Sequence, residues 1–213
     1  MDMSMRVIKW EEYLYSSFLI PHSSFSLAVT IGVFDGVHLG HQSLIRRISA
    51  PPLLPTVVTF RENPVKSINP ARFAGDIYSL EQKLCLLEAL GVKLTVLIDF
   101  SEEISKINGR DFIDLLLGKQ PVTLLALGEN FRCGHGQDIG VDEIRSLANA
   151  RGVETWVAPP VMDGGMPVSS NRIRQALAAG RFEEAQRMLG RPSDSIPCNT
   201  ICTQIGEKYG FNK

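Results

Sequence analysis

Short runs of apolar and β-branched residues alternate along the chain with segments of helical periodicity. The apolar runs cover residues 27–33, 54–60, 93–99, 122–127 and 153–158. Because these runs are hydrophobic almost without interruption, they predict strands of a parallel sheet that is covered on both faces. Helices are expected at residues 39–49, 80–90, 109–118, 142–150, 170–179 and 182–189. Strands and helices in this order predict a three-layer α/β/α fold with a mostly parallel sheet and right-handed crossovers.

The ends of several predicted helices carry local signals. Ser79 and Gln82 form a capping box before the helix at 80–90, and Gly91 follows that helix where a left-handed residue is favoured. Glycines are also expected to end three further helices, at Gly118, Gly180 and Gly190.

Two segments lack regular signals and are predicted to be binding loops. Residues 61–78 contain Pro64, Pro70 and Gly75, and residues 128–140 are rich in glycine. Both follow a predicted strand, and open α/β sheets place their ligands at the carboxyl ends of strands. Residues 1–192 are interpreted as one domain, and residues 193–213 as a short C-terminal tail.

The composition narrows the class of protein. Of the 213 residues, 44% are hydrophobic and 21% are charged, as in ordinary globular domains, and the formal net charge is −1. A nonspecific nucleic-acid binder would need a surplus of Lys and Arg, so nucleic acid is not an expected partner. Residues 13–34 carry no full charge, but a proline and several serines interrupt them and no basic segment precedes them. We therefore expect no membrane span, no targeting segment and a cytoplasmic location.

The four cysteines carry no pairing signal. Their spacing contains no CxxC pair and no zinc framework. The expectation is that all of them are reduced thiols.

The sharpest motif is GVFDGVHLGH, which begins at Gly32 where the first of these strands meets its helix. Gly32, Gly36 and Gly40 allow backbone to approach a ligand closely. His38 and His41 lie at the opening of the helix, where free N–H groups and the helix dipole attract anions. The alternative is a histidine pair that only caps or packs, or that binds a metal. The glycine framework favours phosphate binding, although the segment is neither a Walker loop nor a GxGxxG fingerprint.

The second motif is VSSNRIR, which begins at Val168 and opens a later helix. Ser169, Ser170 and Asn171 are residue types that cap helices, so a well-capped N-terminus explains them without a ligand. Arg174 favours a ligand, because a basic side chain in the first turn opposes the helix dipole unless an anion lies nearby. A triphosphate would supply that anion.

Together these motifs resemble those of the nucleotidyltransferase superfamily, and the chain is similar to the FMN adenylyltransferase part of bacterial FAD synthetases. The similarity extends from about residue 26 to residue 192, through TIGVFDGVHLGHQ, VVTFRENP, LGENFRCG and VSSNRIRQALAAGRFEEAQRMLGRP. It implies a Rossmann-like nucleotidyltransferase fold. It also implies an ATP:FMN adenylyltransferase that produces FAD and pyrophosphate.

The resemblance implies roles for individual residues. The expected catalytic residues, which would act on the ATP phosphates, are His38, His41 and Arg174. The expected ATP-binding residues are Gly32, Phe34, Asp35, Gly40, Ser169, Ser170 and Asn171. The expected flavin-binding residues are Phe60, Asn63, Asn130 and Phe131, with the two aromatics equally explained as core side chains. ATP and FMN would be the small-molecule partners, Mg²⁺ would bridge the triphosphate, no metal ligand is identified, and a monomer is favoured.

Three features depart from the family pattern. Glu62, Asn63 and Pro64 stand where the family often has Pro-His-Pro, and Asn171 stands where a threonine is usual. Residues 193–213 are too few for the riboflavin kinase domain that usually follows, so kinase activity is not expected.

The implied reaction needs no enzymic nucleophile. A phosphate monoester is largely dianionic at pH 7, so alignment and charge neutralisation would carry the transfer. Nearby phosphates would raise the pKa of His38 and His41 above the usual 6.5 or so. Two alternatives stay open. One is a relative with another phosphorylated acceptor, such as nicotinamide mononucleotide, phosphopantetheine or a cytidylyl-transfer substrate, and the other is a nucleotide or flavin sensor without catalysis.

Overall fold

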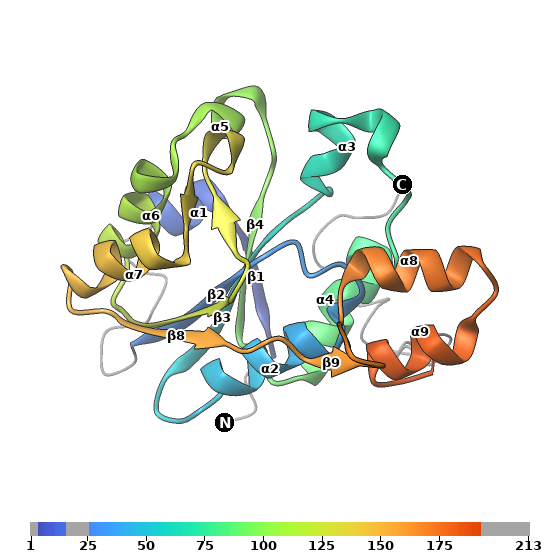
Figure 1. The fold of residues 1–213 in the computed structure, drawn as a ribbon. Coiled ribbons are helices and arrows are strands. Elements are labelled where there is room, and N and C mark those ends of the chain that lie inside the picture. The colour runs from blue at the N-terminus through green and yellow to red at the C-terminus, as the bar shows by residue number, and fades with distance from the viewer. Residues whose placement is uncertain (1–3, 16–25, 193–213) are drawn as a thin grey trace.

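The computed structural model describes residues 4–15 and 26–192. Its central sheet has six strands in the order β1-β4-β3-β2-β5-β8, and every neighbouring pair is parallel (Figure 1). The strands, in chain order, are β1 (Arg6–Lys9), β2 (Leu27–Ile31), β3 (Leu54–Phe60), β4 (Leu94–Ile98), β5 (Val122–Gly128) and β8 (Glu154–Ala158). The predicted parallel sheet is confirmed.

Alternate residues of the strands pack into two separate cores on the two faces of the sheet. On one face, Val29 and Ile31 of β2 contact side chains of α1 (Trp10–Tyr15), α6 (Gly109–Gly118) and α7 (Val141–Asn149). On the other face, Ala28 packs with side chains of α2 (Leu39–Ile48) and α4 (Leu80–Ala89). Every residue of β2 and β4 is buried. Helices on both faces of one sheet make the three-layer α/β/α fold that the strand pattern predicts.

The local signals at the ends of α4, α8 and α9 are also confirmed, whereas Gly118 is the last helical residue of α6 and does not have a positive φ angle. Ser79 and Gln82 form the capping box of α4, in which the Ser79 hydroxyl accepts from the Gln82 N–H and the Gln82 side chain accepts from the Ser79 N–H. Gly91, Gly180 and Gly190 have positive φ angles of 90°, 70° and 69°, as expected where a helix ends in a left-handed residue.

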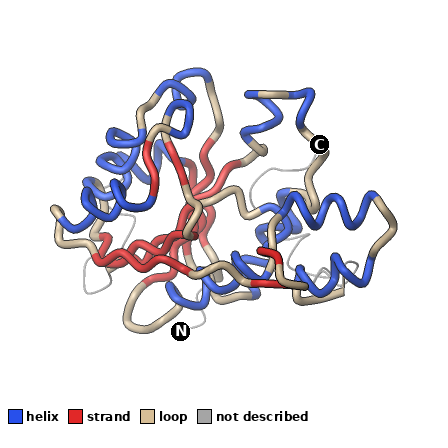
Figure 2. The backbone as a smooth tube through the Cα atoms, in the orientation of Figure 1, coloured by secondary structure: helices blue, strands red, loops and turns tan. Residues whose placement is uncertain are grey.

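The C-terminal helices form a hairpin at one end of the sheet (Figure 2). α8 (Ser170–Ala178) and α9 (Phe182–Leu189) enclose a third small core, which includes Ile173, Met188 and Leu189. A short ribbon formed by β9 (Met162–Asp163) and β10 (Met166–Pro167) leads into α8. The hairpin therefore stands outside the main layers.

Several short elements are absent from the sequence prediction. They are β1, α1, α3 (Pro64–Ile68), α5 (Glu102–Lys106), the strands β6 (Arg132–Cys133) and β7 (Ile139–Gly140), the ribbon β9–β10, and the 3₁₀ turns η1 (Asp35–Val37), η2 (Pro70–Arg72) and η3 (His135–Gln137). Each is too short to show a period of its own. Tertiary contacts hold α1, because the Tyr13 hydroxyl donates to the Leu116 carbonyl at 2.8 Å and the Trp10 ring stacks on Phe112.

Two chemical expectations can be compared with the structure. The expectation of reduced cysteines holds for Cys133, which is a free thiol, and is wrong for Cys85, which is disulfide-bonded. Spacing along a chain does not define which thiols meet in the fold, which explains the error. Within residues 4–15 and 26–192, no helix is long and apolar enough to cross a bilayer.

Candidate active site

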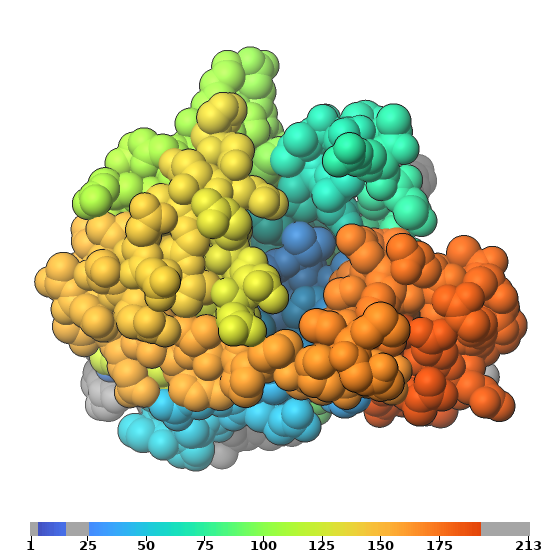
Figure 3. Space-filling model, in the orientation of Figure 1, coloured from blue at the N-terminus to red at the C-terminus, as the bar shows by residue number. Residues whose placement is uncertain are grey.

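The strand order reverses direction at β2. The chain proceeds from β2 to β3 and β4 on one side, and later places β5 on the other side of β2. Ligands of open α/β sheets bind at such a switch point, beyond the carboxyl ends of the strands. In Figure 3 the segment that follows β2, in blue, lies at the base of a hollow. Residues of the 61–78 segment (teal), the segment after β5 (yellow) and the region of α8 (orange) border this hollow.

The turn from β2 into α2 has an unusual backbone. Phe34, Gly36 and Val37 have positive φ angles of 53°, 78° and 41°. A Cβ atom at Gly32 would lie 3.2 Å from the Phe34 ring, so the glycine leaves room for that ring. We call residues 32–38 the β2–α2 turn.

The two histidines of the first motif lie face to face at the start of α2. The ring centroids of His38 and His41 are 3.7 Å apart, and the rings are nearly parallel. His38 is the N-cap residue, and its Nδ1 accepts a hydrogen bond of 3.4 Å from the His41 N–H. Gly40 permits this arrangement, because a Cβ at that position would lie 3.1 Å from the His38 ring. The sequence HLGH therefore makes a compact imidazole pair at a helix N-terminus.

Burial keeps both imidazoles uncharged at neutral pH. His38 is 7% exposed, and burial lowers its pKa to about 4. Burial likewise lowers the pKa of His41 well below its usual value, with further lowering by the charges of Lys83 and Arg191. The sequence analysis expects a bound phosphate to raise the pKa of both histidines. In the protein alone, burial of the two rings lowers the pKa of each. The buried Nδ1 of His41 has no hydrogen-bond partner in the described part of the chain.

Residues of the second motif contact Asp35 of the first motif directly. Ser169 caps α8 by accepting from the Arg172 N–H, and the Ser170 hydroxyl donates to the Asp35 carbonyl oxygen at 2.9 Å. Arg174 forms an ion pair with the Asp35 carboxylate. The guanidinium of Arg174 also donates to the Gly75 carbonyl and to Asn171 Oδ1, both at 2.8 Å. The N-terminus of α8 therefore joins the β2–α2 turn at Asp35.

Asp35 is the centre of this connection. Its Oδ1 accepts from the Ile77 N–H at 2.9 Å, and its other oxygen accepts from Arg174. Burial raises the pKa of Asp35 although the Ile77 N–H and the Arg174 charge act in the opposite direction. A buried carboxylate with two such donors holds three segments together: the β2–α2 turn, the loop before α4, and α8.

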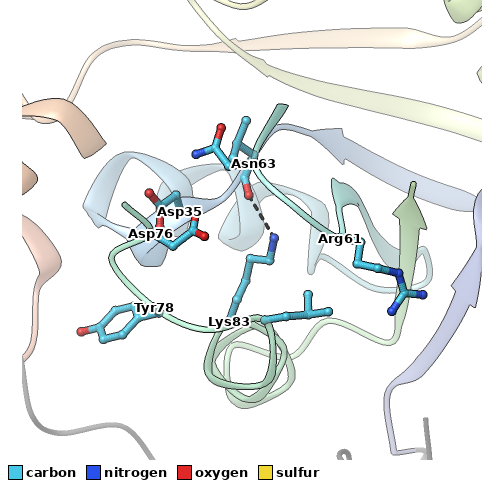
Figure 4. A pocket seen from close by; sticks show the side chains of 8 residues that line it. Asp35, Arg61, Asn63, Asp76, Tyr78 and Lys83 are labelled. Atoms are coloured by element: carbon cyan, nitrogen blue, oxygen red, sulfur yellow. Dashed lines mark hydrogen bonds between the residues drawn. The ribbon is translucent and has the colours of Figure 1, made fainter. Parts of the chain in front are cut away.

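A pocket opens beside Asp35. Figure 4 shows its lining residues, which are Val33, Asp35, Arg61, Asn63, Asp76, Tyr78, Leu80 and Lys83. Lys83 points from α4 into this pocket, with Asp35 and Asp76 on one side and Arg61 on the other. The pocket therefore presents both signs of charge next to the β2–α2 turn.

Lys83 lines this pocket, and the sequence analysis does not identify it. Its ammonium donates to the Phe60 carbonyl at 2.8 Å, and it lies 3.4 Å from both the Val33 carbonyl and the Thr59 hydroxyl. Burial lowers its pKa to about 8. Its position offers the missing signal, because a lysine between Leu80, Leu84 and Leu87 stands on the buried face of its helix.

The residues expected to bind flavin lie at the end of β3, in the segment that follows it and in the turn after β5. Asn63 is 8% exposed, lines the pocket and caps α3 by accepting from the Val65 N–H. Phe60 and Phe131 are partly buried and pack against the core on the α6 face of the sheet. Asn130 is exposed in the turn after β5. The structure thus places Asn63 next to Asp35 and the other three residues on the neighbouring strand ends.

Known proteins are similar in sequence to this chain over most of its length. A bifunctional riboflavin kinase/FMN adenylyltransferase from Escherichia coli K12 is 30% identical over 188 residues, which are 86% of this chain and 60% of that protein. An FAD synthetase from Listeria monocytogenes is 26% identical and is matched over 82% of this chain and 73% of its own. The chain thus spans about 60% of the length of its bifunctional relatives.

A solved structure shares the fold. The crystal structure of a macrolide-efflux protein from Streptococcus pneumoniae superimposes with a TM-score of 0.70 at 27% identity, covering 80% of this chain and 66% of the other. The sequence model of the FAD synthetase family matches residues 21–172, which is more than half of the chain and includes both histidines, the pocket and the start of α8. The chain therefore belongs to the FAD synthetase family.

Proposed function

We propose that this chain transfers the adenylyl group of ATP to FMN, giving FAD and pyrophosphate. The observation that carries the proposal is the contact of the α8 N-terminus with Asp35, which lies in the turn that leads to the histidine pair at the switch point of the sheet. Two helix N-termini that these contacts hold near each other suit a polyphosphate. The membership of the FAD synthetase family and the names of the relatives support FMN as the acceptor.

The imidazole pair suits hydrogen bonding to a phosphate. Because His38 Nδ1 accepts from the His41 N–H, the proton of the neutral His38 ring lies on Nε2, which is then a donor. An approaching triphosphate favours the protonated form of each ring, so binding would raise both pKa values from their low ligand-free positions. The donors would neutralise charge on the α-phosphate and on the leaving pyrophosphate.

The acceptor needs no base from the protein. The phosphate of FMN, with a second pKa of about 6, is mostly dianionic at neutral pH and is already a nucleophile. It attacks the α-phosphorus of ATP, a P–O bond forms, and the bond to the pyrophosphate breaks as that group leaves. The contribution of the chain is to hold two anions in line and to offset their charge.

Arg174 has a double role in this proposal. Its guanidinium is fixed by Asp35, Gly75 and Asn171, so it is positioned before any nucleotide arrives. Its positive charge is partly neutralised by Asp35, and the remainder favours a phosphate at the start of α8. The hydrogen bond from the Ser170 hydroxyl to the Asp35 carbonyl fixes the N-terminus of α8 relative to the turn that leads into α2.

The described residues fit a Mg²⁺ ion that arrives with the nucleotide. Among them, no group of three or more His, Cys, Asp or Glu side chains is arranged to hold a metal. Protein-bound Mg²⁺ commonly takes only one or two carboxylates and otherwise uses phosphate and water oxygens. Asp76, which lines the pocket beside Asp35, is the carboxylate we assign to this ion. The ion would offset the negative charge of the phosphates.

Product analysis tests the proposal. The protein is mixed with Mg·ATP and, in separate reactions, FMN, riboflavin, nicotinamide mononucleotide or phosphopantetheine, and the products and pyrophosphate are separated and quantified. We expect FAD and pyrophosphate from FMN alone. Pyrophosphate release with another acceptor would assign a different substrate. Binding of ATP and FMN without any pyrophosphate would instead indicate a binding protein.

A further inference from the structure

The β2–α2 turn has a shape that needs support from elsewhere in the molecule. Phe34 and Val37 have positive φ angles, and for a β-branched residue such as Val37 this conformation is an outlier. Within the turn, the Val37 N–H donates to the Phe34 carbonyl at 3.2 Å. Strained backbone of this kind persists only where surrounding structure fixes it.

Arg191, which follows α9, supplies such a fixed contact. Its guanidinium donates to the Val37 carbonyl at 3.0 Å and to the Gly36 carbonyl. The same group donates to the Leu189 carbonyl at 3.1 Å, at the end of α9. One planar side chain therefore connects two consecutive carbonyls of the turn to the last helix of the hairpin. It also lies over the ring of Tyr78, a pocket residue.

A second side chain connects the same two places. Gln42 of α2 donates through Nε2 to the Val37 carbonyl at 3.0 Å and to the Leu189 carbonyl at 2.8 Å. The end of α9 can approach α2 this closely only because residue 190 is glycine. A Cβ at Gly190 would lie 2.5 Å from the side chain of Leu39 in α2. The turn and the end of α9 are thus held together by two side chains that share the same carbonyl acceptors.

We propose that Arg191 is a positioning residue for the triphosphate, acting through the carbonyls of Gly36 and Val37 without touching the substrate. The inference rests on the proposed adenylyl transfer. With both carbonyls directed at Arg191, the peptide planes of the turn are fixed, and so is the entry of the chain into α2 at His38. Backbone N–H groups at a helix N-terminus bind phosphate only when they converge on it.

Arg191 also provides a partly buried charge behind the histidines. It contributes to the low pKa of both His38 and His41, whereas burial is the main cause. Lys83 is the other charged group that lowers the pKa of His41, and its own charge faces Asp35 and Asp76 in the pocket. A lysine at position 191 would keep this charge but lose the planar fork that reaches two carbonyls. The Arg191→Lys substitution therefore separates the effect of the charge at position 191 from the effect of the two-carbonyl contact.

The experiment compares Arg191→Ala, Arg191→Lys and Gln42→Ala with the wild type. It measures the Kd of Mg·ATP by calorimetry, and kcat and KM by FAD formation, below the melting temperature of each variant. For Arg191→Ala we expect kcat to fall about 100-fold, as for a misplaced reacting group, with an increased Kd for Mg·ATP and the KM for FMN within about twofold. Arg191→Lys should recover only part of this loss. The double variant with Gln42→Ala should show a non-additive effect, since both side chains hold the Val37 carbonyl.

Arg187→Ala is the matched control. Arg187 lies on α9, four residues before Arg191, but its side chain is 60% exposed and pairs with Asp163, so its removal should leave kcat and the Kd of Mg·ATP unchanged. The proposal is overturned if Arg191→Ala retains the wild-type Kd and kcat, or if Arg191→Lys restores both completely. If Arg191→Ala does not fold, the proposal is tested with Arg191→Lys and Gln42→Ala. It is then overturned if both variants retain the wild-type Kd and kcat. A wild type that makes no FAD would refute the proposed function, while the Kd of Mg·ATP would still test the role of Arg191.

Discussion

Arg174 and Asp35 are 139 positions apart in the chain and form an ion pair at the point where α8 meets the β2–α2 turn. The pair is almost completely covered, with 16% of the Arg174 side chain and 5% of the Asp35 side chain exposed. Each partner also has a backbone contact, to Gly75 and Ile77 respectively. It connects the two motifs that the sequence shows separately.

Removing both partners of this pair should cost less than the sum of the two single removals. Arg174→Ala leaves a buried carboxylate without its counter-charge, and such losses are typically about 3–5 kcal/mol. The Asp35→Asn, Arg174→Ala double variant should be less destabilised than the sum of the single variants. Urea denaturation of the four proteins measures this. Additive single effects would contradict the pairing.

The histidine pair should be essential for turnover. His38→Ala or His41→Ala should lower kcat by about 10²–10³-fold, as does the loss of one donor at a developing anion. The measurement is steady-state FAD formation, with the fold checked by circular dichroism. Folded variants with normal turnover would remove the imidazoles from the mechanism.

Stability should decrease as the solution is acidified below the usual histidine pKa. Burial lowers the pKa of His38 from 6.5 to about 4, so between these values the unfolded chain binds a proton that the folded chain does not. The stability contribution is complete above pH 6.5 and is lost as the pH falls to about 4, by about 3 kcal/mol for this residue. Denaturation of wild type and His38→Asn over this range measures the difference, and parallel curves would contradict the assignment.

Nucleotide binding should take up protons near pH 6. The ligand-free imidazoles are neutral there, and a triphosphate beside them favours the charged form. Calorimetric titration of Mg·ATP in buffers of different ionisation enthalpy gives the number of protons exchanged. We expect net uptake in the wild type and a smaller uptake in the His38→Ala, His41→Ala double variant. Equal uptake in both proteins would assign the protons to other groups.

Gly40→Ala should impair catalysis selectively. The new Cβ would lie 3.1 Å from the His38 ring and would displace it from His41. We expect kcat to fall by at least about tenfold while the melting temperature changes little, because a misplaced group is costly to the rate. Gly118→Ala is the control, since no neighbouring atom lies within 4 Å of the Cβ position. Normal kcat in Gly40→Ala would show that the stacked arrangement is dispensable.

Most of the fold was predictable because the main strands are apolar almost without interruption. β2 and β4 are buried along their whole length, and a parallel strand with helices on both faces has no exposed side to interrupt the pattern. The capping box of Ser79 and Gln82 is a local signal and marks the start of α4 correctly. β1 and α1 were missed because four and six residues are too few to show periodicity.

The site was predictable only where the motif itself is local. His38 and His41 are close in sequence, so their common position at a helix N-terminus follows from the spacing. The contacts of Asp35 with Arg174 and Ser170 depend on how distant segments meet, which no local pattern contains. Lys83 and Arg191 were missed for a related reason, because their charged groups donate mainly to backbone carbonyls of other elements.

The hydrogen bonds from Arg191 to the carbonyls of Gly36 and Val37 also imply an order of events during synthesis. A ribosome would release the histidine motif early, but the side chain that shapes its turn emerges only after about 150 further residues. Until then the growing polypeptide could fold several strands and still have little affinity for a nucleotide. Ligand affinity in this molecule would therefore report that translation has passed α9.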